Sequence, residues 1–355
     1  MEYKGAKYIH LKKGKWGGKG SVIIYYKGDV GVVPGYPSIQ RLVLLSKVPH
    51  YFPEGVSVEE KMNGYNVRVV KVGGEVFAVT RGGYLCPYTN ARLKSVYGEE
   101  LSSLLDELPP GSFVAGEVVG TENPYVRVEY PEAPKFDYFI FDIFVREGDG
   151  WRQMPVEERH ELVRRHGLRG VRLLGTFRPD ESVSKIKEIV DRFDAEGREG
   201  VVLKDPLYKR PPAKYTGSFT NIGDIEQGMK YPFDEGKDYL FPRIVREMFK
   251  VFEEGLAGRK LEERALWLGR AILAPAVEAV KAVAEGRPLH EDFVLRFPTE
   301  GDLEDYLDYV RQLGVKVTVL EKWEEGGWVV VKVRKFKRSP DVIESMLRTG
   351  RTPLD

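Results

Sequence analysis

The stretch EEKMNGYNVRVVKV, residues 59–72, places Lys61 two residues before an Asn-Gly pair. Asn-Gly is a frequent turn signal, and the β-branched residues that follow it predict a strand. NVRVVKV (66–72) is separated from EVFAVT (75–80) by Gly-Gly, so these two segments predict a hairpin. Lys61 is therefore either a solvated charge beside a turn, which is the commoner case, or a nucleophile at the mouth of a pocket.

Outward from this stretch, short strands alternate with turns and two helices. The helical segments are PVEERHELVRRHG (155–167), which has proline at its start and glycine near its end, and DESVSKIKEIVDRFDAEG (180–197). Residues 56–230 otherwise read as short strands, which predicts an α+β fold with mainly antiparallel strands. The apolar segments typical of buried or half-buried strands are GSFVAGEVVG (111–120), FDYFIFDIFV (136–145) and EGVVLKD (199–205).

The pattern becomes helical from about residue 240. Residues 241–258 and 260–286 have apolar residues at helical spacing, and Pro275 predicts a kink or break in the second segment. The second segment has more apolar surface than a lone helical pair easily buries, which favours either a subunit interface or packing onto the same chain. The residues concerned are Leu266, Trp267, Ile272, Leu273, Val277 and Val280.

Composition limits the class of protein. Hydrophobic residues make up 42% and charged residues 31% of the chain, as in soluble globular proteins, and the net charge is only +1. The single cysteine, Cys86, excludes internal disulfides and a Cys-based zinc site. No apolar run approaches the roughly 20 residues that span a bilayer, and the amino end has no signal-peptide core, so we expect a cytoplasmic protein with no membrane partner.

Two basic segments are candidate RNA contacts. Residues 1–20 contain six lysines and one acidic residue, interleaved with Tyr3, Tyr8 and Trp16, a mixture that suits phosphate binding and base stacking. A solvated, charged edge or strand face explains either segment as well. In the second segment five basic residues occupy seven positions: Lys332, Arg334, Lys335, Lys337 and Arg338.

Charged residues at the ends of the apolar strands accompany Lys61. Glu117 lies inside the apolar AGEVVG, where an unpaired carboxylate is costly, and Glu199 and Lys204 begin and end EGVVLK. Lys214 follows in AKYT. A polyanion among them would explain the set, because neighbouring cations balance phosphate charge and lower the pKa of an attacking lysine. Glu199 is a candidate ligand for a divalent ion, and Glu117 a candidate acceptor for ribose hydroxyls.

These motifs together resemble the covalent nucleotidyltransferases, the superfamily of polynucleotide ligases and messenger RNA capping enzymes. Lys61-x-Asn63-Gly64, Arg81 in TRGG, Glu117 in GEVVG, FIFDI, EGVVLK and the lysine at 214 occur in the order and rough spacing of that superfamily. EEKMNGYNVRVV and the long helical region resemble the archaeal ATP-dependent RNA ligases, which are homodimers. The likeness of the catalytic domain covers about residues 56–220.

The resemblance implies a role for each matching residue. Lys61 would form a covalent lysyl-adenylate, Glu199 would act on Mg²⁺ or Mn²⁺, and Glu117 would bind the ribose hydroxyls of ATP. Phe141 would stack on adenine, with Phe139 as the reserve candidate because both share a strand face. Packing in the core is the alternative for both rings. The remaining residues implied for the nucleotide site are Lys204 and Lys214 at the α-phosphate, Arg81 and Arg68 at the ribose or a phosphate, and Glu59, Asn63 and Gly64 of the first motif.

The implied reaction is ATP-dependent RNA ligation. AMP would pass from Lys61 to the 5′-phosphate of an RNA end, and a 3′-hydroxyl would then displace AMP to join two ends or circularise one molecule. Asn63 stands where most of the superfamily has aspartate, and archaeal RNA ligases share this asparagine. The Arg-x-Asp-Lys signature of DNA ligases and capping enzymes is absent from the sequence. Those two enzymes remain alternatives, as does a non-catalytic RNA-binding protein built on the basic terminal segments.

The expected fold is α+β, with a mainly antiparallel nucleotidyltransferase (ATP-grasp-like ligase) catalytic domain. We expect this adenylyltransferase domain over residues 56–235, after an N-terminal β-rich domain over 1–55. A helical dimerisation domain over 236–290 and a small C-terminal α/β domain over 291–355 would follow it.

Overall fold

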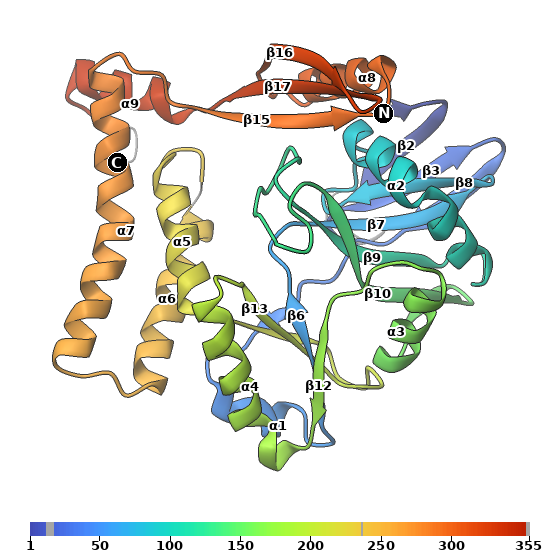
Figure 1. The fold of residues 1–355 in the computed structure, drawn as a ribbon, viewed down its shortest axis with the longest axis horizontal. Helices are drawn as coiled ribbons and strands as arrows, with labels where there is room; N and C mark the ends of the chain where they lie inside the picture. The colour runs from blue at the N-terminus through green and yellow to red at the C-terminus, as the bar shows by residue number, and fades with distance from the viewer. Residues whose placement is uncertain (12–17, 236, 353–355) are drawn as a thin grey trace.

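The computed structural model describes residues 1–11, 18–235 and 237–352, and within them the chain forms four β-sheets. Two five-stranded sheets occupy the centre, a four-stranded sheet lies at one side, and a three-stranded sheet crosses the top (Figure 1). Helices α5, α6 and α7 stand together at the left (Figure 1). The α+β class with mainly antiparallel strands is therefore confirmed.

The first central sheet has the strand order β11-β10-β9-β7-β8, and all its pairs are antiparallel. The predicted hairpin is β7–β8, in which Gly73 and Gly74 have φ of +56° and +78°, conformations that favour glycine. One face packs against α2 (Pro87–Asp106) and α3 (Val156–Arg165). The strand bounds are Tyr65–Val72 for β7, Glu75–Thr80 for β8, Phe113–Val119 for β9, Asp137–Glu147 for β10 and Gly150–Gln153 for β11.

The second central sheet has the order β12-β6-β13-β14-β5, and its β14–β5 pair is parallel. Its apolar side chains pack against α4 (Pro179–Ala195) and α1 (Val48–Tyr51), which the short helix η1 (Leu45–Lys47) precedes. The strand bounds are Gln40–Arg41 for β5, Val56–Lys61 for β6, Leu173–Phe177 for β12, Gly200–Lys204 for β13 and Ala213–Thr216 for β14.

The Asn-Gly turn connects these two sheets. Lys61 is the last residue of β6 and pairs with Gly200, whereas Tyr65 begins β7 and pairs with Val118 in the other sheet. A Cβ atom at Gly64 would lie 2.1 Å from the carbonyl oxygen of Val118, so only glycine fits where the chain crosses. The turn therefore presents Lys61 between two sheets.

The N-terminal four-stranded sheet covers the other face of the first central sheet. Tyr8, Val22 and Ile24 share a core with Val70 and Phe77. Residues 12–17 carry three of the six lysines of the predicted amino-terminal basic segment, and they lie outside the described residues. The strand bounds are Glu2–Tyr3 for β1, Ala6–Leu11 for β2, Ser21–Tyr26 for β3 and Asp29–Val33 for β4.

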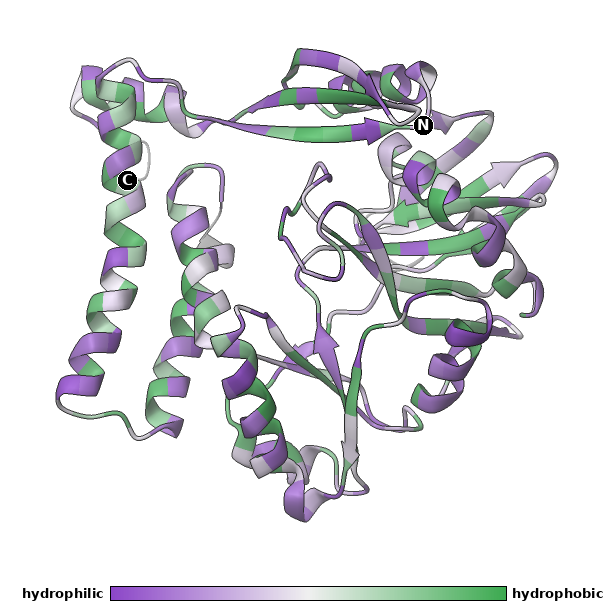
Figure 2. Cartoon of the chain, in the orientation of Figure 1, coloured by the Kyte–Doolittle hydropathy of each residue, from purple (hydrophilic) through white to green (hydrophobic). Residues whose placement is uncertain are grey.

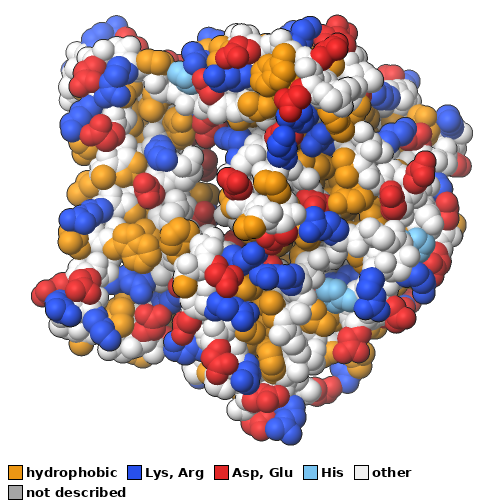
Figure 3. Space-filling view, viewed as in Figure 1, with side chains coloured by type: hydrophobic (Ala, Val, Ile, Leu, Met, Phe, Trp, Pro, Cys, Tyr) orange, Lys and Arg blue, Asp and Glu red, His pale blue; other side chains and the backbone are white. Residues whose placement is uncertain are grey.

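Helices α5 (Ser218–Met229), α6 (Lys237–Glu253) and α7 (Arg259–Ala284) pack together through Ile222, Ile225 and Ala271. The sequence predicted a kink or a break at Pro275. A break is wrong, because α7 continues through that residue. Figure 2 shows hydrophobic stretches along both α6 and α7, and Figure 3 shows hydrophobic side chains on their outer surface. Within the described residues no helix has both the length and the apolar character needed to cross a bilayer.

The C-terminal unit consists of the sheet β15-β17-β16 with α8 (Glu300–Gln312) and α9 (Ser339–Thr349). Three of its predicted RNA contacts are ion-paired: Arg334 with Asp292, Lys332 with Glu321 and Lys337 with Glu291. This pairing favours the explanation of a charged strand face. The strand bounds are His290–Phe297 for β15, Val317–Glu325 for β16 and Trp328–Phe336 for β17.

Helix α2 was not predicted from the sequence, because residues 56–230 were expected to contain strands, turns and only two helices, at 155–167 and 180–197. Its first turns bury polar side chains, among them Thr89 and Asn90, so its sequence does not show a simple apolar stripe. The burial comes from the C-terminal unit, since the ring of Tyr88 packs edge-on against Phe297 at 5.4 Å. A partner about 200 residues away in sequence therefore stabilises this helix.

Candidate active site

A cavity of about 280 Å³ lies where the two central sheets meet. Eight predicted site residues line it, and three do not: Asn63, Arg68 and Glu199. The predicted residues in the lining are Glu59, Lys61, Gly64, Arg81, Glu117, Phe141, Lys204 and Lys214, and the other lining residues include Tyr36, Ile39, Tyr65, Asn66, Val171 and Val202.

Lys61 and Glu199 form an ion pair at this junction. Lys61 Nζ lies 2.6 Å from Glu199 Oε2, and the two side chains are 22% and 12% exposed. The pairing of Lys61 with Gly200 brings the end of β6 beside the start of β13 and so places Glu199 next to the lysine. The pair thus puts a carboxylate in contact with the predicted nucleophile while leaving the amine accessible from the cavity.

Glu117 lies on β9 opposite Asn66 and extends into the cavity. Burial raises the pKa of its carboxyl to about 7, and the negative charge of Glu199 adds to the rise, while Lys61 and Arg81 oppose it. The Gly64 N–H also favours the ionised form. Near neutral pH about half of these groups are therefore ionised, and the ionised form can accept hydrogen bonds at a cost to the ligand-free fold.

Glu117→Gln is expected to stabilise the ligand-free protein at pH 8. A carboxyl whose folded pKa is raised favours folding fully below its unfolded pKa and loses that contribution as pH rises through about 7. Removing the charge should raise the free energy of unfolding by about 1–2 kcal/mol at pH 8 and by much less at pH 5. Urea unfolding at both pH values measures this difference. The exposed Glu161→Gln on α3 is the control, and an equal gain for Glu117→Gln at the two pH values would contradict the assignment.

Lys214 lines the cavity from β14. Burial lowers the pKa of its amine to about 8, and the positive charges of Arg41 and Lys61 lower it further. In the described chain no carboxylate oxygen lies within ion-pairing distance of Lys214, in contrast with Lys61. A half-buried cation without an acidic partner is suited to an anionic ligand.

Lys204 has a different environment from the one expected for an α-phosphate ligand. Its Nζ lies 2.7 Å from Glu59 Oε2, 2.9 Å from Asp142 Oδ1 and 2.5 Å from the carbonyl oxygen of Phe141. Its three donors are thus used within a buried network, which also contains Arg159 bound to Glu59. In this structure Lys204 and Glu59 support the wall that carries Phe141, and neither has a hydrogen-bonding group left over for phosphate.

The two predicted stacking residues on β10 differ in their access to the cavity. Phe141 lines the cavity, and its ring lies 5.3 Å from that of Tyr36 in an edge-on arrangement. Phe139 lies in a buried cluster with Met62, and the Arg169 guanidinium covers its ring at 4.7 Å. A bulge at residues 140–142 interrupts the regular alternation on which the expectation of a shared face depended.

Arg81, Arg68 and Asn63 differ in their access to the cavity. Arg81 is exposed at its wall. Arg68 is fully buried and donates to the backbone carbonyls of Pro34, Gly20 and Thr80, so its guanidinium holds the N-terminal sheet against β7 and β8. The Asn63 backbone N–H donates to Tyr130 Oη at 2.7 Å, which fixes the turn.

Sequence reasoning missed several polar residues of the wall, among them Tyr36 and Asn66. Tyr36 belongs to a Pro- and Gly-rich segment with no periodic signal, and its hydroxyl donates to Asp142. Asn66 is buried, and its Oδ1 has no hydrogen-bond partner in the described residues. Its position opposite Glu117 follows from strand register, which the sequence alone does not reveal.

Comparison with known proteins identifies relatives along the whole chain. A family model described as RNA ligase matches residues 54–216, and one described as Ligase Pab1020 C-terminal region matches residues 227–350. An uncharacterized protein of Methanocaldococcus jannaschii is 37% identical over 358 residues, which cover 98% of this chain and 89% of that protein.

Solved structures extend the likeness to the fold. Two forms of an archaeal ATP-dependent RNA ligase are 35% and 34% identical, each with a TM-score of 0.89 over 99% of this chain and 92% of theirs. A structure from Aquifex aeolicus, named provisionally as an ATP-dependent DNA ligase, is 28% identical with a TM-score of 0.82 over 98% of this chain and 97% of that chain.

Proposed function

The chain belongs to the archaeal ATP-dependent RNA ligases, and from that premise we propose that it joins a 5′-phosphate to a 3′-hydroxyl through a lysyl-AMP on Lys61. The observation that carries this proposal is the contact between Lys61 and Glu199 beside a cavity that also contains Lys214 and Glu117. These groups supply a nucleophile, a carboxylate, a cation for phosphate and an acceptor for ribose.

In the first step the Lys61 amine, once deprotonated, attacks the α-phosphorus of ATP. A nitrogen–phosphorus bond forms, the nitrogen releases a proton, the bond from the α-phosphorus to the bridging oxygen breaks, and the electron pair of that bond leaves with pyrophosphate. Glu199, at 2.6 Å from Nζ, orients the amine before attack. Alignment and charge neutralisation supply most of the acceleration in such transfers.

In the second step a 5′-phosphate oxygen of RNA attacks the same phosphorus. The nitrogen–phosphorus bond breaks, the lysine recovers its electron pair and a proton, and an adenylylated RNA results. In the third step a 3′-hydroxyl attacks the 5′-phosphorus, loses its proton and displaces AMP. The products are a phosphodiester bond, AMP and pyrophosphate, which balance the reactants ATP and two RNA ends.

The walls of the cavity fit the other parts of ATP. Phe141 and Tyr36 offer aromatic surface to the adenine ring, and Glu117 offers a carboxylate to the ribose hydroxyls. Lys214 is placed for the α-phosphate, and Arg81 for the ribose or a phosphate at the exposed side. Phe141 and Glu117 come from the first central sheet and Lys214 from the second, so the groups proposed for base and sugar and the cation proposed for phosphate belong to different sheets.

A divalent ion fits the carboxylate side of the site. Within the described residues no group of three or more His, Cys, Asp or Glu is arranged to hold a metal ion alone. Glu199 and phosphate oxygens of ATP would together hold Mg²⁺ or Mn²⁺, because both ions prefer oxygen ligands. The ion would neutralise charge on the phosphate during transfer.

Competitive labelling followed by ligation tests the function. Label from α-labelled ATP should enter the protein, excess unlabelled ATP should suppress it, and GTP and NAD should not. The labelled protein should then join 5′-phosphorylated single-stranded RNA in preference to sealing nicked DNA. Labelling by GTP would favour a capping-type enzyme, preference for nicked DNA would favour a DNA ligase, and RNA retention without label would favour a binding protein.

We also propose that two chains form a homodimer through α6 and α7. Five of the six residues predicted for an interface are exposed, and Phe241, Met248 and Phe252 on α6 extend the apolar surface. A second copy would remove this surface from water. Sedimentation velocity should give a dimer that Leu273→Glu converts to monomer, and a wild-type monomer at micromolar concentration would contradict the proposal.

A further inference from the structure

Three cations from separate parts of the chain lie close together beside the cavity. Lys214 lines the cavity itself, whereas Arg41 and Arg246 line a small adjoining pocket with Thr216 and Asn221. Arg41 lies on β5 and pairs in register with Lys214 on β14, and Arg246 extends from α6. Within the described residues none of the three has a carboxylate oxygen at ion-pairing distance. Most buried or half-buried cations elsewhere in the protein are paired, so this uncompensated charge marks a place where an anion would be stabilised.

Neutral groups hold the two arginines in place. Arg41 Nη1 donates to Thr216 Oγ1 at 2.7 Å, and Arg246 Nη1 donates to Asn221 Oδ1 at 3.0 Å. Thr216 Oγ1 in turn donates to Asn221 Oδ1 at 3.0 Å, so both guanidinium groups share one hydrogen-bonded support. This support orients the cations without neutralising them, as a binding site for a phosphoanion requires.

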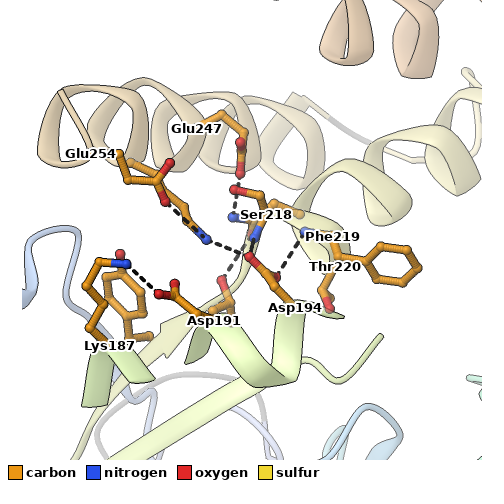
Figure 4. Close-up of polar contacts among 12 residues, drawn as sticks. Lys187, Asp191, Asp194, Ser218, Phe219, Thr220, Glu247 and Glu254 are labelled. Carbon is orange, nitrogen blue, oxygen red and sulfur yellow. Dashed lines mark hydrogen bonds and ion pairs between the residues drawn. The ribbon is translucent and has the colours of Figure 1, made fainter. Parts of the chain in front are cut away.

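The helix that carries Arg246 is fixed to the catalytic sheets. Figure 4 shows Asp194, at the end of α4, beside Ser218 and Phe219 at the start of α5. The Asp194 carboxylate accepts hydrogen bonds from the backbone N–H groups of Ser218 at 3.0 Å and Phe219 at 3.2 Å. Lys250 of α6 binds the same carboxylate at 2.7 Å. Glu247, next to Arg246, accepts from the Asn221 amide at 3.0 Å. These contacts hold α6, and with it Arg246, against α4 and α5.

The electrostatic environment agrees with this geometry. Burial lowers the pKa of Arg41 to about 9 and that of Arg246 to about 10. Repulsion by Arg246 contributes to the first shift and repulsion by Arg243 to the second, while the carboxylates of Glu199 and Asp224 oppose both. Arg41 and Arg246 also contribute to the lowered pKa of Lys214. The three charges therefore act on one another, and a bound anion would relieve their repulsion.

We propose that Arg41 and Arg246, adjoining Lys214 at the α-phosphate, form one phosphate site that is used twice, first for the β- and γ-phosphates of ATP and then for the 5′-phosphate of RNA. The inference rests on the proposed function. Displacement at the α-phosphorus is in line, so the group that attacks in the second step takes the position that pyrophosphate left. A site that holds the departing pyrophosphate is thus also placed for the incoming RNA phosphate, and the helical region supplies one of its arginines.

Arg246→Ala tests the proposal in two separate assays. The first measures labelling of the protein by α-labelled ATP, and the second measures transfer of AMP from preformed lysyl-AMP to 5′-phosphorylated RNA. We expect both rates to fall by about 30-fold or more, as for loss of a charged phosphate contact in a transfer reaction.

The controls separate the site from the fold and from the proposed chemistry. Arg243→Ala removes a cation one turn earlier on α6 that is ion-paired with Asp224 at 2.7 Å, and it should change either rate less than threefold. Arg246→Gln keeps an amide donor toward Asn221 without the charge and replaces the alanine variant if that variant does not fold. Wild-type labelling with normal rates for the Arg246 variants, or loss of only one of the two rates, would overturn the shared site. Absence of label in the wild type would overturn the proposed function instead.

Discussion

Lys61→Ala protein incubated with α-labelled ATP and Mg²⁺ is expected to show no labelled protein band. The label depends on a nitrogen–phosphorus bond to Nζ, and alanine offers no atom that forms it. The rate of adenylate formation should fall by at least about 1000-fold, which is the order of loss seen when a nucleophile is removed. Gel analysis of the labelled protein after denaturation measures the covalent adduct directly.

Two comparisons define what the result means. Lys71→Ala removes a lysine on β7 that does not line the cavity and whose Nζ lies 2.6 Å from Asp106 Oδ2, and this variant should label normally. Lys61→Ala should also ligate RNA that is already adenylylated, because the third step does not need the nucleophile. Persistent label in Lys61→Ala would show that another residue carries AMP and would refute the assignment.

Motifs near strand ends could be interpreted from the sequence because few residues separate them from the strands that position them. Lys61 and Lys214 reach the cavity from short strands and Glu117 from within β9, and Glu199 contacts Lys61 just before β13, since apolar runs mark the strands that carry or adjoin these side chains. The hairpin at Gly73 and Gly74 was equally accessible for the same reason.

Features that depend on distant contacts could not be predicted in this way. Lys204 ends an apolar strand just as a phosphate ligand would, but only the fold shows that Glu59 and Asp142 use its donors. Arg68 looks like a ribose ligand until the backbone carbonyls around it are located. Neither the register of a strand nor the identity of a buried partner is encoded in local spacing.

The phosphate site illustrates the same limit at longer range. Arg41 lies about 170 residues before Lys214 in sequence, and Arg246 belongs to a helix that periodicity marked only as amphipathic. Their common position arises from the parallel β5–β14 pair and from the packing of α6 on α5. The helical region therefore contributes charge beside the catalytic cavity as well as an apolar surface, whereas sequence reasoning considered only a subunit interface or packing onto the same chain.

Glu199→Ala is expected to lower the rate of adenylate formation by about 100-fold or more. The change removes the carboxylate that orients Nζ and the one protein group proposed to bind the divalent ion. Because binding of the ion would then depend on ATP alone, the Mg²⁺ concentration that gives half-maximal labelling should rise severalfold, and excess Mg²⁺ should restore part of the rate. A Mg²⁺ titration of the labelling rate measures both effects.

The Mg²⁺ titration distinguishes orientation of Lys61 from binding of the divalent ion. If Glu199 only oriented Lys61, the rate would fall while the half-maximal Mg²⁺ concentration stayed the same, which would refute the metal assignment. Glu196→Ala removes a carboxylate three residues earlier that binds Arg198 at 3.1 Å, and it should leave both quantities unchanged. Near-normal labelling by Glu199→Ala would remove Glu199 from the reaction altogether, and its 2.6 Å contact with Lys61 would then be a structural ion pair.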